Sequence, residues 1–123
     1  MGRLFLIIGA VSAAISVAAG AFGAHSLRQT IEPSLLDVFE TGARYQMYHA
    51  LALVGVGLVA SRWPSSLLAS AGWLFVAGTV LFTGSLYAMT FTGIRVLGAI
   101  TPLGGLCFIG GWICLAVAAA RIK

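Results

Sequence analysis

Charged residues are scarce in this chain. Only 8% of its 123 residues are charged and 60% are hydrophobic, whereas about 25% of the residues in a soluble domain are charged. So few charges cannot cover the surface of an ordinary water-soluble domain, and that class is excluded. The composition predicts a protein whose main partner is the lipid bilayer.

Acidic residues are the scarcest, and all three of them, Glu32, Asp37 and Glu40, lie in one short segment. Elsewhere, single basic residues separate four long uncharged runs. A hydrocarbon core of roughly 30 Å needs about 20 apolar residues in a helix, so the runs predict four spanning helices. We expect an all-α membrane four-helix bundle, a single domain of residues 1–123, with helices at about 4–24, 45–60, 67–91 and 102–120.

The first apolar run also resembles a secretory signal peptide, because Arg3 precedes it and small residues at 19–21 mimic a cleavage site. Its apolar stretch is longer than the roughly 15 residues at which the hydrophobic part of such peptides ends. We therefore expect this run to be a retained first helix.

Clusters of basic residues are missing as well. The Lys and Arg side chains are scattered near the expected helix ends, without the basic face that binds phosphates, so we expect no nucleic-acid partner. Four spans would place Arg3, Arg62, Arg121 and Lys123 on one side of the membrane and Arg28, Arg44 and Arg95 on the other. Because the side richer in Lys and Arg stays in the cytoplasm, four against three favours cytoplasmic N- and C-termini.

Catalytic motifs are also absent. The sequence has no CxxC or HExxH motif, no Gly-Lys-Ser/Thr phosphate loop and no nucleophile elbow. The two cysteines, Cys107 and Cys114, are two helical turns or about 10 Å apart, too far for a disulfide bond within one helix. We expect a protein that is not an enzyme, with no cofactor and no metal.

One polar segment separates the first two expected spans. Ser34 followed by Asp37 resembles a capping box at a helix start. Apolar residues then recur at helical spacing: Leu35, Leu36, Phe39 and Ala43. The segment predicts a short amphipathic helix at about 34–43 that lies on the membrane surface.

Small residues form a stripe on each of two expected spans. The first stripe has a strict four-residue spacing: Ser12, Ser16, Gly20 and Ala24. The last helix carries a second stripe: Cys107, Gly110, Gly111, Cys114 and Ala118. Because small residues let membrane helices approach closely, we expect Ser12, Ser16, Gly20, Ala24, Gly110, Cys114 and Ala118 to form helix contacts.

Polar residues gather where the first and second expected spans meet. His25 ends the first span, and Arg44, Tyr45, Gln46 and His49 open the second. Antiparallel packing would bring these groups to one face of the membrane, with the two histidines close to each other.

Three interpretations of this polar cluster remain open. In the first, His25 and His49 make structural hydrogen bonds, because polar groups at membrane depth must be satisfied internally. In the second, the cluster binds a proton, an anion or a small solute, with Arg44 supplying charge and Glu32 or Glu40 exchanging protons. In the third, the histidines, alone or together with Met47, hold a metal or haem.

Four stretches together resemble domain-of-unknown-function family 423, a family of small bacterial inner-membrane proteins with transmembrane protein 256 as a eukaryotic relative. They are "GAFGAHSL", "YQMYHALAL", "LFTGSLYAMT" and "ITPLGGLCFIGGW". The positions that match the family pattern are Gly20, Gly23, Ala24, His25, Tyr45, Gln46, His49, Gly84, Leu86, Tyr87, Pro102, Gly104 and Gly105. The resemblance implies an all-helical inner-membrane protein without an established activity. It also adds Tyr87 to the expected cluster.

These observations lead to one main expectation and two alternatives. We expect an accessory or scaffold subunit that packs with itself, as a homo-oligomer, or with other membrane proteins. In that case His25 would hydrogen-bond to the Tyr45–His49 turn or to Tyr87. The alternatives are an oligomeric channel or transporter for a small solute or proton, and a haem or copper protein that uses His25 and His49.

Overall fold

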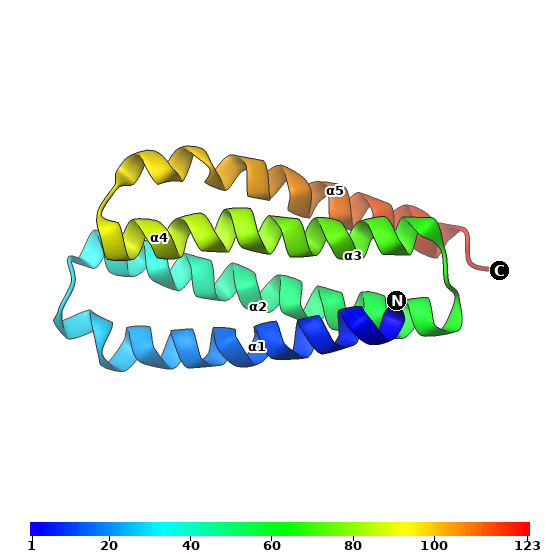
Figure 1. The fold of residues 1–123 in the computed structure, drawn as a ribbon, viewed down its shortest axis with the longest axis horizontal. Helices are drawn as coiled ribbons and strands as arrows, with labels where there is room; N and C mark the ends of the chain where they lie inside the picture. The colour runs from blue at the N-terminus through cyan, green and yellow to red at the C-terminus, as the bar shows by residue number, and fades with distance from the viewer.

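The computed structural model describes residues 1–123 as four antiparallel helical rods of similar length (Figure 1). The first two rods are α1 (Gly2–His25) and α2 (Pro33–Arg62), and the last is α5 (Thr101–Ala120). The third rod is continuous through α3 (Ser66–Gly78), a π-helical segment η2 (Thr79–Thr83) and α4 (Gly84–Thr92). Two 3₁₀ turns, η1 (Leu27–Gln29) and η3 (Arg95–Ala99), complete an all-helical fold.

Local sequence explains where several rods begin and end. Pro33 occupies the first turn of α2, where a missing N–H costs nothing. The Ser65 side chain caps α3 by accepting a hydrogen bond from the Leu68 N–H at 3.1 Å. Gly93, at φ 70°, takes the left-handed conformation that ends α4.

A run of small residues joins α1 to α2, which form the most extensive helix pair in the molecule. The buried small residues of α1 are seven positions apart: Gly2, Gly9, Ser16 and Gly23. They meet small residues of α2 at the same spacing: Ala43, Ala50 and Gly57. A Cβ added to Gly9 would lie 2.7 Å from the carbonyl oxygen of Ala50, so the two backbones are in direct contact.

This seven-residue period differs from the four-residue stripe expected on α1. Ser12 and Ser16 contact α2, but Gly20 has no neighbour within 4 Å of a Cβ position and Ala24 is exposed. A four-residue step overshoots one helical turn by about 40°, whereas seven residues fall about 20° short of two turns. Residues spaced four apart therefore move progressively around α1, away from the face that contacts α2.

In helix α5, too, the buried small residues differ from the expected stripe. Its buried small residues are Gly104, Gly111 and Ala118, again seven apart. Of the expected residues, Ala118 is buried with Ala60 and Leu68, and Cys114 is half-buried against the core. Gly110 lies at the edge of the contact, where a Cβ would be 3.4 Å from Leu74.

Aromatic rings fill the centre of the bundle. Phe5 and Phe75 are fully buried and Phe108 nearly so. Each ring occupies the space that a glycine leaves on another rod: Phe5 at Gly72, Phe75 at Gly111 and Phe108 at Gly78. The core is therefore packed by rings set directly against backbone.

A separate surface helix at 34–43 is not present. These residues form the first turns of α2, which continues without a break to Arg62. The buried positions Phe39, Gln46 and Leu53 repeat every seven residues across the expected boundary, so one face stays in contact with the bundle. Gly42 is buried within this helix, and a Cβ at its position would lie 3.0 Å from the Tyr87 ring.

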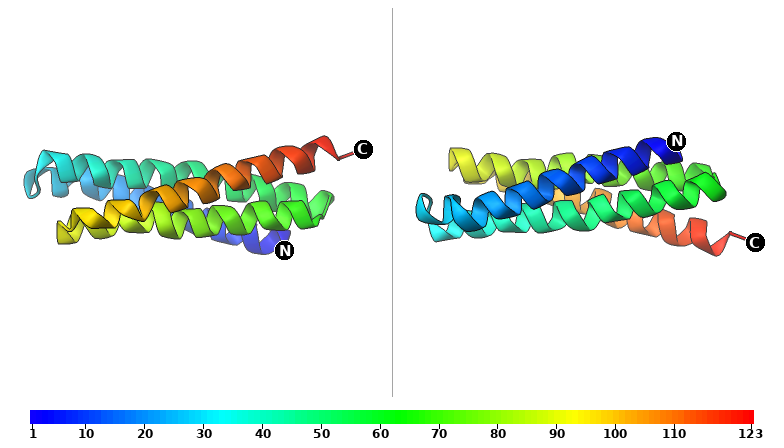
Figure 2. Two further views of the ribbon diagram at one scale, coloured as in Figure 1. Left: turned by 90° about the horizontal axis from the view of Figure 1, so that it is seen from above. Right: turned by 90° about the horizontal axis from the view of Figure 1, so that it is seen from below.

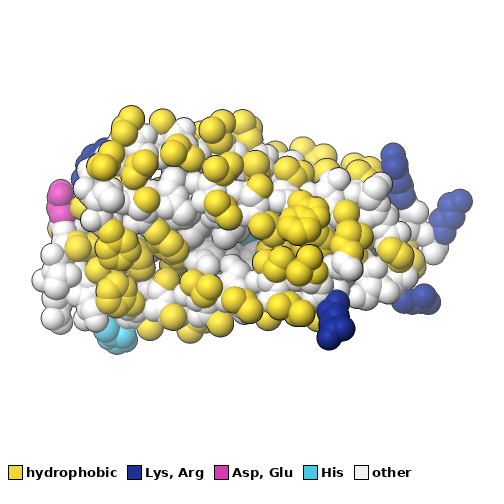
Figure 3. All heavy atoms as spheres, viewed as in Figure 1, with side chains coloured by type: hydrophobic (Ala, Val, Ile, Leu, Met, Phe, Trp, Pro, Cys, Tyr) yellow, Lys and Arg dark blue, Asp and Glu magenta, His cyan; other side chains and the backbone are white.

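Apolar side chains cover much of the sides of the bundle, and charged side chains gather at its two ends (Figure 3). Three segments are long and apolar enough to cross a membrane: Gly2–Gln29, Ser66–Thr92 and Arg95–Ala120. The N- and C-termini lie at the same end (Figures 1 and 2). The sequence prediction of an all-helical membrane protein is confirmed at this level.

Candidate functional site

A belt of polar side chains crosses the middle of the bundle. Its centre is Gln46 on α2, which is 6% exposed. The Gln46 Nε2 donates to the carbonyl oxygen and the Oγ of Ser12 at 3.3 and 3.2 Å, and the Tyr87 hydroxyl donates to Gln46 Oε1 at 2.7 Å. One amide side chain therefore connects α1, α2 and α4.

Two buried hydroxyls extend this belt. Ser16 Oγ donates to the carbonyl oxygen of Ala43 at 2.7 Å, and Thr83 Oγ1 donates to that of Gly42 at 3.2 Å. Both bonds reach across to backbone carbonyls of α2, from α1 on one side and from η2 on the other. We call Ser12, Ser16, Gln46, Thr83 and Tyr87 the polar belt.

His49 lies one turn beyond Gln46 and is 4% exposed. Its Nδ1 is 2.8 Å from the carbonyl oxygen of Tyr45, and the indole N–H of Trp112 donates to its Nε2 at 3.1 Å. An indole N–H is only a donor, so Nε2 accepts and Nδ1 carries the proton. His49 is therefore a neutral imidazole with both nitrogens engaged.

Aromatic packing holds this imidazole in place. The His49 and Phe108 rings are parallel, with centroids 3.5 Å apart and an interplanar angle of 5°. Phe75 lies 5.6 Å away on another side. The ring is thus fixed between α3 and α5 as well as by its two hydrogen bonds.

The structure does not bring His25 to this region. His25 is exposed at the end of α1, and no hydrogen bond joins it to Tyr45, His49 or Tyr87. Ser12, which bonds to Gln46, is thirteen residues or about 20 Å from His25 along α1. The expected approach of the two histidines does not occur, because α2 begins at Pro33 and His49 therefore lies in mid-bundle.

The other predicted residues divide between two faces of α2. Gln46 and His49 point inward, and Tyr45 stacks on Phe82 with ring centroids 4.7 Å apart while remaining 37% exposed. Arg44 points outward and donates only to Thr41 Oγ1, at 3.2 Å.

Sequence reasoning missed two partners of the site. Trp112 was not linked to His49, although an indole N–H in an apolar helix needs an acceptor and His49 is among the few polar residues at that depth. Thr83 looked like one hydroxyl among several in the third span. Only the contact between η2 and α2 distinguishes it.

Charged contacts lie at the end of the bundle opposite the termini. Arg95 Nη2 is 3.8 Å from Glu32 Oε2 and donates to Ser34 Oγ at 3.0 Å, and Arg28 is 4.0 Å from Glu40. Glu40 is half-buried and the other three charged side chains are more than half exposed, so each pair stabilises the fold by about 1 kcal/mol at most.

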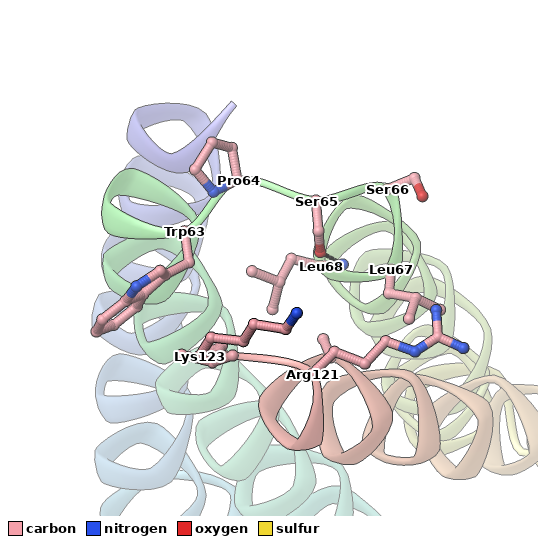
Figure 4. Close-up of a pocket in the computed structure, with 10 residues that line it drawn as sticks. Trp63, Pro64, Ser65, Ser66, Leu67, Leu68, Arg121 and Lys123 are labelled. Atoms are coloured by element: carbon pink, nitrogen blue, oxygen red, sulfur yellow. Dashed lines mark hydrogen bonds between the residues drawn. The ribbon is translucent and has the colours of Figure 1, made fainter.

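One pocket, of about 380 Å³, opens at the end that carries the termini. It lies between the Trp63–Leu68 turn and the C-terminal Arg121 and Lys123 (Figure 4). None of the polar belt residues lines it. The pocket is therefore separate from the buried polar groups.

Comparison with known proteins identifies the family. The model of the family described as "Protein of unknown function (DUF423)" matches residues 19–105. The UPF0382 membrane protein YwdK of Bacillus subtilis is 48% identical over 97% of this chain and 98% of its own length. UPF0382 membrane proteins of Staphylococcus aureus and Staphylococcus haemolyticus are 49% and 47% identical, over 94% of this chain and 94% and 93% of theirs.

No solved structure matches the chain. The family match and the near-complete alignment with relatives confirm the resemblance seen in the sequence motifs. The chain belongs to the DUF423 (UPF0382) family of membrane proteins.

Proposed function

We propose that this protein is a non-enzymatic accessory or scaffold subunit of the bacterial inner membrane, which packs with itself or with a larger membrane complex. One observation carries the proposal: every buried polar side-chain atom has a hydrogen-bond partner within the chain. Gln46 and His49, the two polar groups best placed to bind a ligand, are both used to join helices. The hydrogen bonds of Gln46 and His49 therefore support a structural role for both side chains.

The proposal includes four membrane crossings. Helix α2 packs along α1 from Gly57 beside Gly2 to Phe39 beside Gly23. A helix in contact with a spanning neighbour over this length lies at the same depth, so α2 crosses with it. Its polar first third lowers its hydropathy without changing its place in the bundle.

The proposed orientation puts both termini in the cytoplasm. The end that carries the termini has four basic residues, Arg3, Arg62, Arg121 and Lys123, against Arg28 and Arg95 at the other end, because Arg44 lies within α2. The excess of Lys and Arg sets the orientation of short-looped membrane proteins.

Two alternatives require a different geometry. A channel or transporter needs a hydrated path, and the rings of Phe5, Phe75 and Phe108 fill the middle of a single copy. A haem or copper centre shared by His25 and His49 needs the two side chains within reach of one metal. No observation in this bundle favours either alternative.

Gentle extraction of the native protein tests the proposal. Mass spectrometry would identify associated subunits, and an absorbance spectrum of the same sample would reveal a chromophore. We expect a self-oligomer or a stoichiometric membrane partner, with no visible absorbance. A lone chain, or one that carries haem, copper or a small molecule, would overturn the proposal.

A further inference from the structure

The pocket of about 380 Å³ at the end that carries the termini has no part in the proposed function. The end of α2, the start of α3 and the end of α5 surround it (Figure 4). Leu68 and Ala118 line it and are only 1% and 5% exposed. Five of its ten lining residues are hydrophobic, so the pocket combines an apolar inner part with a polar rim.

The polar rim carries positive charge and hydrogen-bond donors. The amino group of Lys123 points into the space that the lining residues enclose, and Arg121 borders the same space (Figure 4). Ser65 Oγ accepts a hydrogen bond from the Leu68 N–H at 3.1 Å, which leaves its own O–H free to donate. No acidic side chain lines the pocket. Its rim is therefore complementary to an anion.

The two cations of the pocket have no carboxylate partner in the chain. Both ion pairs of the molecule, those of Arg28 and Arg95, lie at the opposite end, together with all the acidic residues. Membrane topology explains why Lys and Arg occur at a helix end, but it does not require them to surround a cavity. The charge of Arg121 and Lys123 is thus available to an anion from outside the chain.

The depth of the pocket follows from the packing of α1 against α2. The 24 residues of α1 are about 36 Å long, so its ends reach just beyond a hydrocarbon core of about 30 Å. Gly2, the first residue of α1, lies against Ser61, two residues before Trp63. Trp63 lines the pocket and is 44% exposed, as suits a tryptophan at the membrane interface. The pocket therefore opens in the headgroup layer, where lipid phosphates lie.

We propose that this pocket binds a phosphate group, with Arg121 and Lys123 supplying charge and Ser65 a hydrogen bond. The phosphate belongs either to the headgroup of an anionic phospholipid or to a soluble phosphate compound. Basic pockets between transmembrane helices are suited to anionic headgroups, because the cations meet the phosphate while the apolar residues meet the rest of the lipid. Depth and apolar lining here favour the lipid.

Titration of the full-length protein with phosphatidylglycerol in mild detergent tests the site, with bound lipids counted by native mass spectrometry. We expect one lipid to bind in preference to the others, and its dissociation constant to rise about tenfold in Arg121→Gln and in Lys123→Gln. Lys123→Arg keeps the charge and should keep most of the affinity. Arg3→Gln is the matched control, because it removes the same charge from the same end outside the pocket, and it should change the affinity by about twofold at most.

Calorimetry with inorganic phosphate and glycerol 1-phosphate distinguishes the two sources. Much weaker binding of both soluble compounds than of phosphatidylglycerol would identify a headgroup site. Equally tight binding of either compound, with displacement of the lipid, would identify a site for soluble phosphate. The absence of any stoichiometric binding, or an equal loss of affinity in Arg3→Gln and the pocket variants, would overturn the proposal.

The outcomes separate this site from the proposed function. A protein that keeps its associated subunits but binds no phosphate compound would overturn the site and leave the subunit role in place. A lone chain that binds phosphatidylglycerol through Arg121 and Lys123 would overturn only the subunit role.

Discussion

Helix α2 carries two polar faces within the same three turns, and they differ in how their hydrogen-bonding groups are used. On the inner face, Gln46 and His49 find partners on α1, α4 and α5. On the outer face, Asp37 and Arg44 point away from the bundle, and neither forms an ion pair within the chain. In lipid a polar group must be satisfied by protein, so the inner face completes the fold, whereas the charges of the outer face have no ion-pair partner in the chain.

The difference does not come from residue type alone. Tyr45 and Tyr48 are both tyrosines one turn apart, but Tyr45 stacks on Phe82 whereas Tyr48 remains 53% exposed. The position of each residue around the helix decides which other rod it meets. The comparison therefore predicts that inner substitutions change monomer stability, while outer substitutions change assembly.

The largest expected effect separates inner from outer positions on α1. Gly9→Leu should lower the free energy of unfolding by about 3 kcal/mol, because its side chain would meet the backbone of Ala50 and Val54. Gly20→Leu, which meets nothing within 4 Å, is the matched control. Thermal unfolding in detergent measures both. Equal losses would show that the α1–α2 contact is not where the structure puts it.

Breaking the polar belt should have the next largest effect. Gln46→Leu leaves the Tyr87 hydroxyl without its acceptor, so we expect a loss of about 2 kcal/mol. Arg44→Leu, two residues earlier on the outer face, should leave the stability of the isolated chain within about 0.5 kcal/mol. Denaturant unfolding measures the loss of stability in both variants. A larger loss in Arg44→Leu than in Gln46→Leu would contradict the distinction between the two faces.

Removing the imidazole should have a smaller effect. His49→Phe keeps an aromatic ring against Phe108 but leaves the Trp112 N–H without an acceptor, at a cost of about 1 kcal/mol. A double-mutant cycle with Trp112→Phe isolates this bond. A coupling energy near zero would mean that the two side chains do not interact.

The smallest effect should come from the exposed charges at the bundle end. Glu32→Gln removes the partner of Arg95, and we expect a change in stability of about 0.5 kcal/mol or less. Salt titration of thermal unfolding serves as the measurement. A larger change would show that this pair is shielded from water, contrary to its exposure.

The membrane character and the all-helical fold could be predicted from the sequence, because single charges separate runs long enough to span. The continuity of α2 could not. The sequence predicts a break at residue 44, whereas Phe39, Gln46 and Leu53 are buried at one seven-residue period across it, and this packing depends on the neighbouring rods.

The candidate site was predicted in part. Gln46, His49 and Tyr87 stand out as polar residues in apolar surroundings, but their partners depend on how the rods are aligned. Moving the start of α2 from residue 45 to Pro33 shifts His49 by several turns relative to α1. That shift separates His49 from His25 and brings Gln46 to Ser12.

Oxygen accessibility of spin labels in a lipid bilayer tests the central claim most directly. One label replaces Thr41 on the outer face of α2, beside Arg44, and another replaces Val17 at a similar depth on α1. We predict that the label at 41 is shielded from oxygen dissolved in the lipid by an associated subunit, while the label at 17 is fully accessible. Equal accessibility at both positions would mean that lipid, rather than a second subunit, covers the outer face of α2.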